Sequence, residues 1–69
     1  MDWIDGNSSN IERFIYDASS QVLTVEFKNG GVYNYFDVPE FVFEEMQSAG
    51  SRGQYLAQRI KGTYRYARA

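Results

Sequence analysis

The fold of this 69-residue chain is decided by the stretch Gly30-Gly31-Val32-Tyr33-Asn34-Tyr35-Phe36-Asp37-Val38-Pro39. The segment at 29–31 tolerates positive φ, as a hairpin loop requires, and an aromatic strand is expected at 32–36. Before it, residues 22–28 alternate between apolar and polar side chains, which predicts the partner strand. Pro39 is suited to the first position of a helix. The stretch therefore predicts a hairpin followed by a helix.

The length of the hairpin loop decides which face of the strand is buried. A two-residue loop would point an asparagine into the core, whereas a three-residue loop at 29–31 keeps it outside. That longer loop sets Phe27 opposite Tyr33, and it also sets Val25 opposite Tyr35. Because the pleat has a period of two, a slip of one residue would turn every side chain to the other face. We expect the three-residue loop, because it places two apolar residues opposite two aromatic ones across the hairpin.

Outward from the hairpin, the patterns predict an α+β fold in which two helices pack on one face of a three-stranded antiparallel meander. The strands are expected at about 10–16, 22–28 and 32–36, and the helices at about 39–48 and 52–61. Ser51 with Gln54 forms a capping-box pattern for the second helix, and Gly62 ends it. The tail from 63 to 68 is expected to be extended.

Composition argues against catalysis. The chain has no His and no Cys, so the commonest general base and the best nucleophile are missing. No group of side chains has the spacing of a metal site. We therefore expect no enzyme activity, no catalytic residues, no metal and no cofactor. The absence of Cys fits a reducing compartment, and no apolar run approaches the roughly 18 residues of a membrane span. A cytoplasmic protein without a membrane partner is expected.

The short chain raises the question of self-association. A domain of this size buries only about 60% of the surface that its unfolded chain exposes. Small scaffolds usually need disulfides, a metal or oligomerisation. Since Cys and His are absent, a homo-oligomer is one expectation. A monomer whose core is filled by aromatic residues, 17% of the chain, is the other.

Charge is distributed unevenly along the chain. The net charge is −2, and all nine acidic residues lie in residues 1–45, together with two basic residues. Residues 46–69 hold five basic residues and no acidic one. The acidic body and the basic end either pair with each other or leave a basic patch free for an anion.

Several short motifs together resemble one family. They are Ser8-Ser9-Asn10-Ile11, Tyr16-Asp17, Leu23-Thr24-Val25-Glu26-Phe27, Gly31 to Pro39 with its Tyr33-Asn34-Tyr35 element, Ser51-Arg52-Gly53 with Tyr55, and Ile60-Lys61-Gly62 with Tyr64. In this combination the chain resembles the KTSC domain over about residues 8–67. That domain occurs at the C-terminus of some lysyl-tRNA synthetases and as free-standing small proteins of bacteria and phages.

The resemblance implies a single KTSC-like domain at residues 8–69 and an N-terminal extension at 1–7. The extension, with Trp3 and Ile4, either orders against a partner or covers the edge of the sheet. The resemblance brings no catalytic residues. It implies an RNA-binding role only through association with a tRNA-charging enzyme.

Basic and aromatic side chains are interleaved in the last part of the chain. This combination holds a phosphate backbone while an aromatic ring stacks on a base. The candidate ligand-binding residues are Arg52, Tyr55, Arg59, Lys61, Tyr64, Arg65, Tyr66 and Arg68. In the alternative interpretation, Tyr55 and Tyr64 belong to the core and the arginines pair with glutamates of the first helix. Tyr33 and Tyr35 are core residues if the helices cover them, and a stacking platform if part of the face stays open.

The leading hypothesis is a non-enzymatic module that binds RNA or tRNA through these residues. A net charge of −2 gives little counterion release, so a structured or single-stranded ligand is favoured over a duplex. The alternative is a small, phage-encoded oligomer that binds a nucleotide-like molecule between subunits, or inhibits a host protein. A third hypothesis is a protein-interaction domain that docks through Trp3, Phe41 and the sheet edge.

Overall fold

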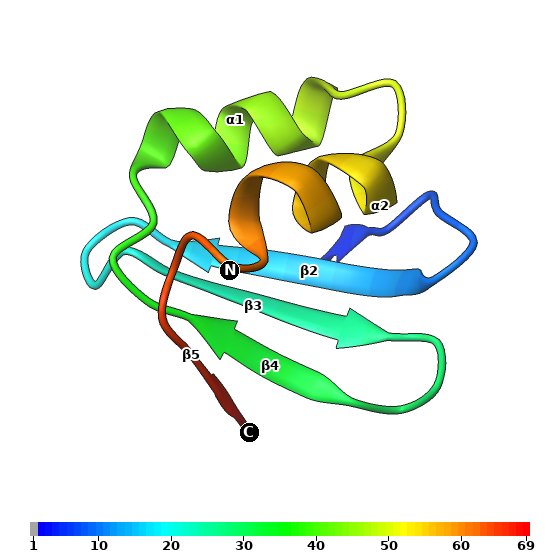
Figure 1. Cartoon of the computed structure of the whole chain (residues 1–69), viewed down its shortest axis with the longest axis horizontal. Coiled ribbons are helices and arrows are strands. Elements are labelled where there is room, and N and C mark those ends of the chain that lie inside the picture. The colour runs from blue at the N-terminus through cyan, green and yellow to red at the C-terminus, as the bar shows by residue number, and fades with distance from the viewer. Residues whose placement is uncertain (1) are drawn as a thin grey trace.

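The computed structural model describes residues 2–69 as a five-stranded antiparallel sheet with helices on one face (Figure 1). In chain order the elements are β1 (Ile4–Asp5), β2 (Ile11–Asp17), β3 (Val22–Phe27), β4 (Val32–Tyr35), α1 (Glu40–Ser48), α2 (Arg52–Tyr55), η1 (Leu56–Ile60) and β5 (Tyr66–Arg68). The strands lie in the sheet in the order of the sequence. The α+β class is confirmed, but the prediction of only three strands is wrong, because one strand is added at each edge.

The two added strands are very short. β1 pairs with β2 through Ile4 opposite Phe14, and β5 pairs with β4 through Tyr66 opposite Tyr35. Runs of two and three residues are too short to display alternation, so only their pairing makes them strands. β1 places part of the predicted extension at residues 1–7 against the sheet edge. Met1, the first residue of that extension, lies outside the described residues.

The β3–β4 hairpin has a three-residue loop, as predicted, but the loop is Lys28-Asn29-Gly30. The N–H of Phe27 donates to the carbonyl of Gly31 at 2.8 Å, and the N–H of Gly30 donates to the carbonyl of Phe27 at 2.9 Å. Gly30 has a φ of 96°, a conformation that glycine adopts without steric cost. Pairing on the β4 side therefore begins at Gly31, one residue before the expected start of that strand at residue 32.

This position of the loop shifts the register of the hairpin by two residues. Val25 lies opposite Tyr33, and Leu23 lies opposite Tyr35. The predicted partners, Phe27 for Tyr33 and Val25 for Tyr35, are therefore wrong. Since two residues are one full period of the pleat, both tyrosines still face the helices.

A β-bulge at Glu12 sets the face of β2. Ile11 lies opposite Phe27, whereas Arg13 lies opposite Glu26, so Glu12 is the additional residue. Ile11 and Phe14 consequently share the buried face despite their odd separation. Simple alternation along this segment could not assign the face, because the bulge interrupts it.

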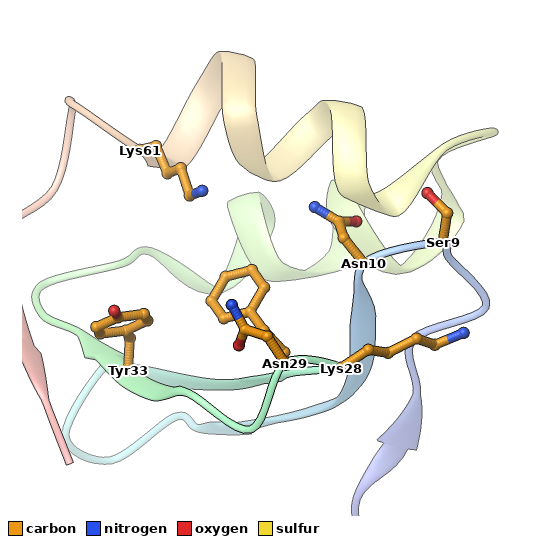
Figure 2. Close-up of a pocket in the computed structure, with 7 residues that line it drawn as sticks. Ser9, Asn10, Lys28, Asn29, Tyr33 and Lys61 are labelled. Carbon is orange, nitrogen blue, oxygen red and sulfur yellow. The ribbon is translucent and has the colours of Figure 1, made fainter.

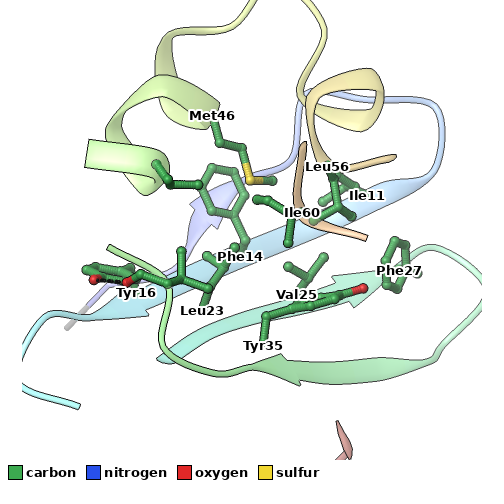
Figure 3. Packing of buried hydrophobic residues seen from close by; sticks show 12 residues of the cluster. Ile11, Phe14, Tyr16, Leu23, Val25, Phe27, Tyr35, Met46, Leu56 and Ile60 are labelled. Atoms are coloured by element: carbon green, nitrogen blue, oxygen red, sulfur yellow. Dashed lines mark hydrogen bonds between the residues drawn. The ribbon is translucent and has the colours of Figure 1, made fainter. Parts of the chain in front are cut away.

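The core fills the layer between the sheet and the helices (Figure 3). Its members are Ile11, Phe14, Tyr16, Leu23, Val25, Phe27, Tyr35, Val38, Val42, Met46, Leu56 and Ile60. The Tyr16 hydroxyl donates to the carbonyl of Val38, and burial, with smaller effects of Glu40 and Asp17, raises the pKa of Tyr16. Throughout residues 2–69, every buried side-chain polar atom has a hydrogen-bond partner. The core is therefore complete within one chain.

The two predicted helices are present with local changes. Pro39 precedes α1 rather than starting it, and its carbonyl accepts the N–H of Val42 at 3.0 Å. Ser51 caps α2 as predicted, since its hydroxyl accepts the N–H of Gln54 at 3.2 Å. The second helix then widens into the π-helical segment η1, where the N–H of Lys61 donates to the carbonyl of Leu56 at 2.8 Å. Sequence periodicity does not distinguish such a π turn from an α-helix.

The exposed surface of the chain fits its mass. The chain exposes 4307 Å², and a compact domain of this mass is expected to expose about 4,450 Å². Self-association stays a prediction. Over the same residues, 2–69, no helix has the length and apolar character needed to cross a bilayer.

Gly6 provides a test of how β1 is held. A Cβ at Gly6 would lie 2.1 Å from the carbonyl oxygen of Ile11. The backbone N–H of Gly6 donates to the backbone carbonyl of Glu12 at 2.9 Å. We expect Gly6→Ala to lower the free energy of unfolding by about 1–3 kcal/mol, because backbone must move. Gly50→Ala is the control, since a Cβ there meets nothing within 4 Å. Urea unfolding measures both, and equal stability of the two variants would contradict this packing.

Candidate nucleic-acid interface

The helix layer leaves the sheet face over β4 and β5 partly uncovered (Figure 1). Tyr35 lies in the core at 2% exposure and Tyr33 at its margin, whereas Tyr66 in β5 is 61% exposed. The three rings nevertheless share one face, because Tyr66 lies opposite Tyr35 in the sheet. Of the two interpretations of Tyr33 and Tyr35, the structure makes Tyr35 a core residue and Tyr33 a residue of the open margin.

These three rings form what we call the tyrosine surface: Tyr33, Tyr35 and Tyr66. The Tyr66 ring centroid lies 5.9 Å from that of Tyr33, with the planes at 89°, and 5.9 Å from that of Tyr35, with the planes at 39°. A cavity of about 440 Å³ is lined by the tyrosine surface together with Lys61 and Gly62. Burial, together with Tyr33 and Tyr66, raises the pKa of Tyr35, so its hydroxyl keeps its proton at neutral pH.

Basic side chains flank the tyrosine surface. The Arg68 guanidinium carbon lies 5.9 Å from the centroid of the Tyr33 ring, and Lys61 Nζ lies 5.2 Å from that of Phe27. In the described part of the chain, neither Lys61 nor Arg68 forms an ion pair with a carboxylate. Both charges are thus available to an anion beside exposed aromatic rings.

A second cavity, of about 420 Å³, adjoins the first and is here called the hairpin pocket (Figure 2). Its walls come from the loop before β2, the β3–β4 hairpin and the residue that follows η1. The lining residues are Ser9, Asn10, Phe27, Lys28, Asn29, Tyr33 and Lys61. Tyr33 and Lys61 line both cavities, so the two form one continuous surface.

Arg52, the first predicted site residue, forms hydrogen bonds within the fold. Its Nη1 donates to the carbonyl of Asp5 at 2.8 Å, and its Nη2 and Nε donate to the carbonyl of Gln47 at 2.7 and 3.2 Å. The guanidinium carbon also lies 5.5 Å from the ring centroid of Phe14. Arg52 therefore ties β1 to the end of α1 and faces away from the tyrosine surface.

Tyr55 and Tyr64 also contact the fold. The Tyr55 hydroxyl donates to Glu45 Oε1 at 2.6 Å, which joins α2 to α1, and Tyr64 packs against the core. Burial and the Glu45 carboxylate raise the pKa of Tyr55 to about 12, although the nearby Arg59 opposes the shift. Arg59 itself is exposed on η1. The interpretation of Tyr55 and Tyr64 as core-contacting residues fits these contacts.

Arg65 lies beside a different set of residues. Its Nη2 lies 3.3 Å from Asp37 Oδ2, and its guanidinium carbon lies 5.1 Å from the centroid of Phe36. Within residues 2–69, it is the one basic residue of the last part of the chain that pairs with a carboxylate. The acidic and basic parts of the sequence therefore remain largely unpaired, and the expected pairing of arginines with the glutamates of α1 is not seen among these residues.

Of the predicted site residues, the structure brings together Lys61, Tyr66 and Arg68. The predicted ligand-binding set does not include several residues that line the same cavities, namely Asn10, Phe27, Lys28 and Asn29, and it leaves out Tyr33 and Tyr35, which the sequence suggests only as a conditional stacking platform. For the two tyrosines a signal was present, since an odd loop already puts them on the helix side. The pairing of β5 beside β4, which places the exposed Tyr66 next to them, had no such signal.

Two further exposed aromatic residues do not share a surface. Trp3 lies under the Arg13 guanidinium, 4.2 Å from carbon to ring centroid, and Arg13 faces away from the helices. Phe41 is 55% exposed on α1 in the helix layer. Since the sheet separates them, a docking face that uses both Trp3 and Phe41 has no support in this geometry.

The motif Ser51-Arg52-Gly53 has a local packing role next to the hairpin pocket. A Cβ at Gly53 would lie 2.6 Å from Asn10 Oδ1 and 2.8 Å from Ser8 Oγ. Glycine therefore lets the Ser8-Ser9-Asn10 turn pack against α2. Two motifs that are far apart in the sequence are thereby in contact.

Comparison with known proteins gives the same family by sequence and by structure. The model of the KTSC domain matches residues 7–64. The lysine–tRNA ligase of Trichormus variabilis is 47% identical over 58 residues, which is 84% of this chain and 10% of that protein. A protein of Tsukamurella paurometabola is 36% identical over 58 residues, 87% of its length.

A solved structure agrees with the whole fold. The crystal structure of a KTSC domain protein from Yersinia pestis superposes with a TM-score of 0.94 at 29% sequence identity. The match covers 99% of this chain and 96% of that one. In contrast, the chain spans about a tenth of the length of the lysine–tRNA ligases that it matches.

Arg52 is expected to support stability rather than binding. Arg52→Lys keeps the charge but cannot donate to two carbonyls from three nitrogens, so we expect the free energy of unfolding to fall by about 1–2 kcal/mol. Arg59→Lys, on an exposed position, is the matched control and should unfold as the wild type does. Urea unfolding measures both. A normal stability of Arg52→Lys together with weaker anion binding would place Arg52 in the interface instead.

Tyr55 is expected to make stability depend on alkaline pH. Its pKa is raised to about 12 in the folded chain, whereas an unfolded tyrosine ionises near about 10. The folded state therefore holds the proton longer, and the contribution of Tyr55 to stability is complete below pH about 10 and is lost as the pH rises toward about 12. Urea midpoints at several alkaline pH values should decline less steeply in Tyr55→Phe. An unchanged decline would contradict the raised pKa.

Proposed function

This chain belongs to the KTSC domain family, and we propose that it is a non-catalytic module that binds single-stranded or structured RNA through the tyrosine surface. The observation that carries the proposal is the exposure of Tyr66, at 61%, beside Tyr33 on a sheet face that the helices leave open. Exposed aromatic rings are the platforms on which unpaired bases stack. Stacking of at least one base is thus the core of the proposed interaction.

The charges around the rings support the same ligand. Lys61 lines the cavity at the tyrosine surface and Arg68 lies near Tyr33, so a phosphate next to a stacked base would find a cation. The glutamates of α1 at 40, 44 and 45 are exposed in the helix layer instead. An RNA strand would therefore meet a basic margin on a protein whose net charge is −2.

The relatives support RNA over other polyanions. Lysine–tRNA ligases carry a segment that is up to 47% identical to this chain, and their name states that tRNA is a substrate of the whole protein. A module that contacts RNA would fit in such a protein. The similar short protein from Tsukamurella paurometabola is compatible with a domain that also acts alone.

The proposal predicts that Tyr66 and Arg68 contribute to RNA affinity in different ways. Tyr66→Ala should weaken binding of a labelled single-stranded RNA about five- to a hundredfold, the range of one lost stacking contact. Arg68→Ala should weaken binding and make the slope of log affinity against log salt shallower by about 0.7, because one phosphate contact is lost. Fluorescence anisotropy over a salt series, with tRNA as a second probe, measures both effects.

Two control variants match these changes. Phe41→Ala removes a ring of similar exposure from α1, and Arg65→Ala removes the same charge from the tail next to Asp37. Both should bind RNA within about twofold of the wild type. If the anisotropy of every RNA stays flat at low salt, or if Phe41→Ala weakens binding as much as Tyr66→Ala, the tyrosine surface is not an RNA interface.

A further inference from the structure

We propose that the hairpin pocket accepts an RNA base whose exposed edge carries only hydrogen-bond acceptors, and that it therefore prefers guanine to adenine and cytosine. The inference rests on the proposed RNA-binding function and names the base that this site would select. Its basis is the direction of three nitrogen donors, those of Asn10, Asn29 and Lys61, into one opening (Figure 2).

The amide of Asn10 is fixed with its nitrogen toward the pocket. The Ser8 hydroxyl accepts the backbone N–H groups of Asn10 and Ile11, at 3.2 and 3.4 Å. Its own hydrogen is thus left to donate to Asn10 Oδ1 at 2.7 Å. Since the oxygen is held by Ser8, the other end of the amide, Nδ2, presents its two donors toward Lys61 (Figure 2).

The amide of Asn29 is fixed by a backbone donor. The N–H of Gly31 donates to Asn29 Oδ1 at 2.9 Å, so this oxygen is the acceptor. The nitrogen of Asn29 then points toward the opening between Tyr33 and Asn10 (Figure 2). Both asparagines therefore have their oxygens engaged within the fold and offer donors to a ligand.

Lys61 completes the set of donors. Its Nζ lies 5.2 Å from the centroid of the Phe27 ring and extends into the same opening. Among the described residues that line the pocket there is no carboxylate, so the ammonium has no acidic neighbour there. The remaining polar groups are the hydroxyls of Ser9 and Tyr33 and the ammonium of Lys28. Figure 2 shows the Lys28 ammonium and the Ser9 hydroxyl pointing away from the opening, so the nitrogen donors directed into it are those of Asn10, Asn29 and Lys61.

The edges of the bases differ in how they match such donors. The Hoogsteen edge of guanine presents two acceptors, N7 and O6, which lysine recognises. Asparagine recognises adenine through its amide oxygen and nitrogen together, but here both oxygens are engaged within the fold, and the amides offer only donors. Adenine places its N6 amino group and cytosine its N4 amino group at the corresponding edge. Each would bring a donor against Lys61 or an asparagine nitrogen and leave both without a partner. Uracil has a single acceptor, O4, and its affinity should rank between that of guanine and those of adenine and cytosine.

A base in this position also stacks on the tyrosine surface. Tyr33 lines the hairpin pocket and the neighbouring cavity, and its ring packs edge to face on Tyr66, 5.9 Å between centroids. One ring therefore supports the base while the donors contact its edge. Arg68, 5.9 Å from the centroid of Tyr33, is placed for the phosphate that follows.

The test uses the full chain and short labelled RNAs. The probe is a cytidine heptamer with one variable central base: guanine, inosine, 7-deazaguanine, uracil, adenine or cytosine. We expect guanine and inosine, which share O6 and N7, to bind alike and about five- to a hundredfold more tightly than adenine or cytosine. Replacement of N7 by a C–H group in 7-deazaguanine should lose part of that preference. Anisotropy titrations give the ratios.

Isosteric variants separate the donors from the fold. Asn10→Asp and Asn29→Asp keep the acceptor that Ser8 or Gly31 uses and replace the nitrogen donors with a charged carboxylate oxygen. Each should reduce the ratio of guanine to adenine affinity at least about threefold, since one contact to the base edge is lost. Asn34→Asp adds the same charge on the opposite face, where Oδ1 accepts from Thr24, and should keep the wild-type ratio. The ratio within one variant cancels the effect of the added charge on the phosphates, which all heptamers share.

The outcomes distinguish this inference from the proposed function. If all heptamers bind with equal affinity, RNA binding stands and the base preference is overturned, as it also is if adenine binds more tightly than guanine. If the Asn34→Asp variant loses the ratio as fully as Asn10→Asp does, the preference does not arise in the hairpin pocket. If neither the heptamers nor tRNA bind at low salt, the proposed function itself fails.

Discussion

The odd length of the loop Lys28-Asn29-Gly30 is the constraint on which both the core and the interface depend. Gly30 closes the loop with a φ of 96°, and the period of the pleat then decides the face of every residue in β4. A loop of even length would turn Tyr35 out of the core and Tyr33 away from the helix side. The same loop holds Asn29 by the N–H of Gly31, which directs its amide nitrogen outward. One turn thereby places a core residue, a stacking residue and a hydrogen-bond donor.

The width of the sheet relative to the helix layer separates the structural from the functional aromatic residues. Tyr35 lies where the helices still cover the sheet, and burial of its ring stabilises the fold. β5 extends the sheet beyond that cover, so Tyr66 gains little from burial at 61% exposure. Exposed aromatic area next to unpaired cations contributes little to stability, and it is the feature that the proposed RNA contact would use. The edge strand, although short, thus extends the core face of the sheet into the surface that we propose as the RNA interface.

Much of the fold could be predicted because its longer elements carry a clear period: β3, β4, α1 and the start of the second helix, with the cap at Ser51. The rest depended on pairing. β1 and β5 are too short to have a pattern, the bulge at Glu12 interrupts the alternation of β2, and only the hydrogen bonds reveal that Lys28 belongs to the loop. Prediction of the site residues was limited in the same way. A basic residue such as Arg52 looks available in the sequence, but its guanidinium donates to the carbonyl of Gln47, five residues earlier, and to that of Asp5 in a distant segment.

The charge of the molecule determines what kind of RNA recognition such a site can achieve. With two free cations near the rings, Lys61 and Arg68, the salt dependence for a single strand has a slope of only about −1.4, so phosphate contacts supply modest affinity. In the proposed complex, stacking on Tyr33 and Tyr66 would add affinity without regard to sequence. Discrimination would then have to come from contacts to base edges, for which we propose the fixed amides of the hairpin pocket. A domain built in this way depends less on electrostatic attraction than a strongly basic one does, and it is suited to select a base within an RNA that another part of a larger protein, or high local concentration, brings near.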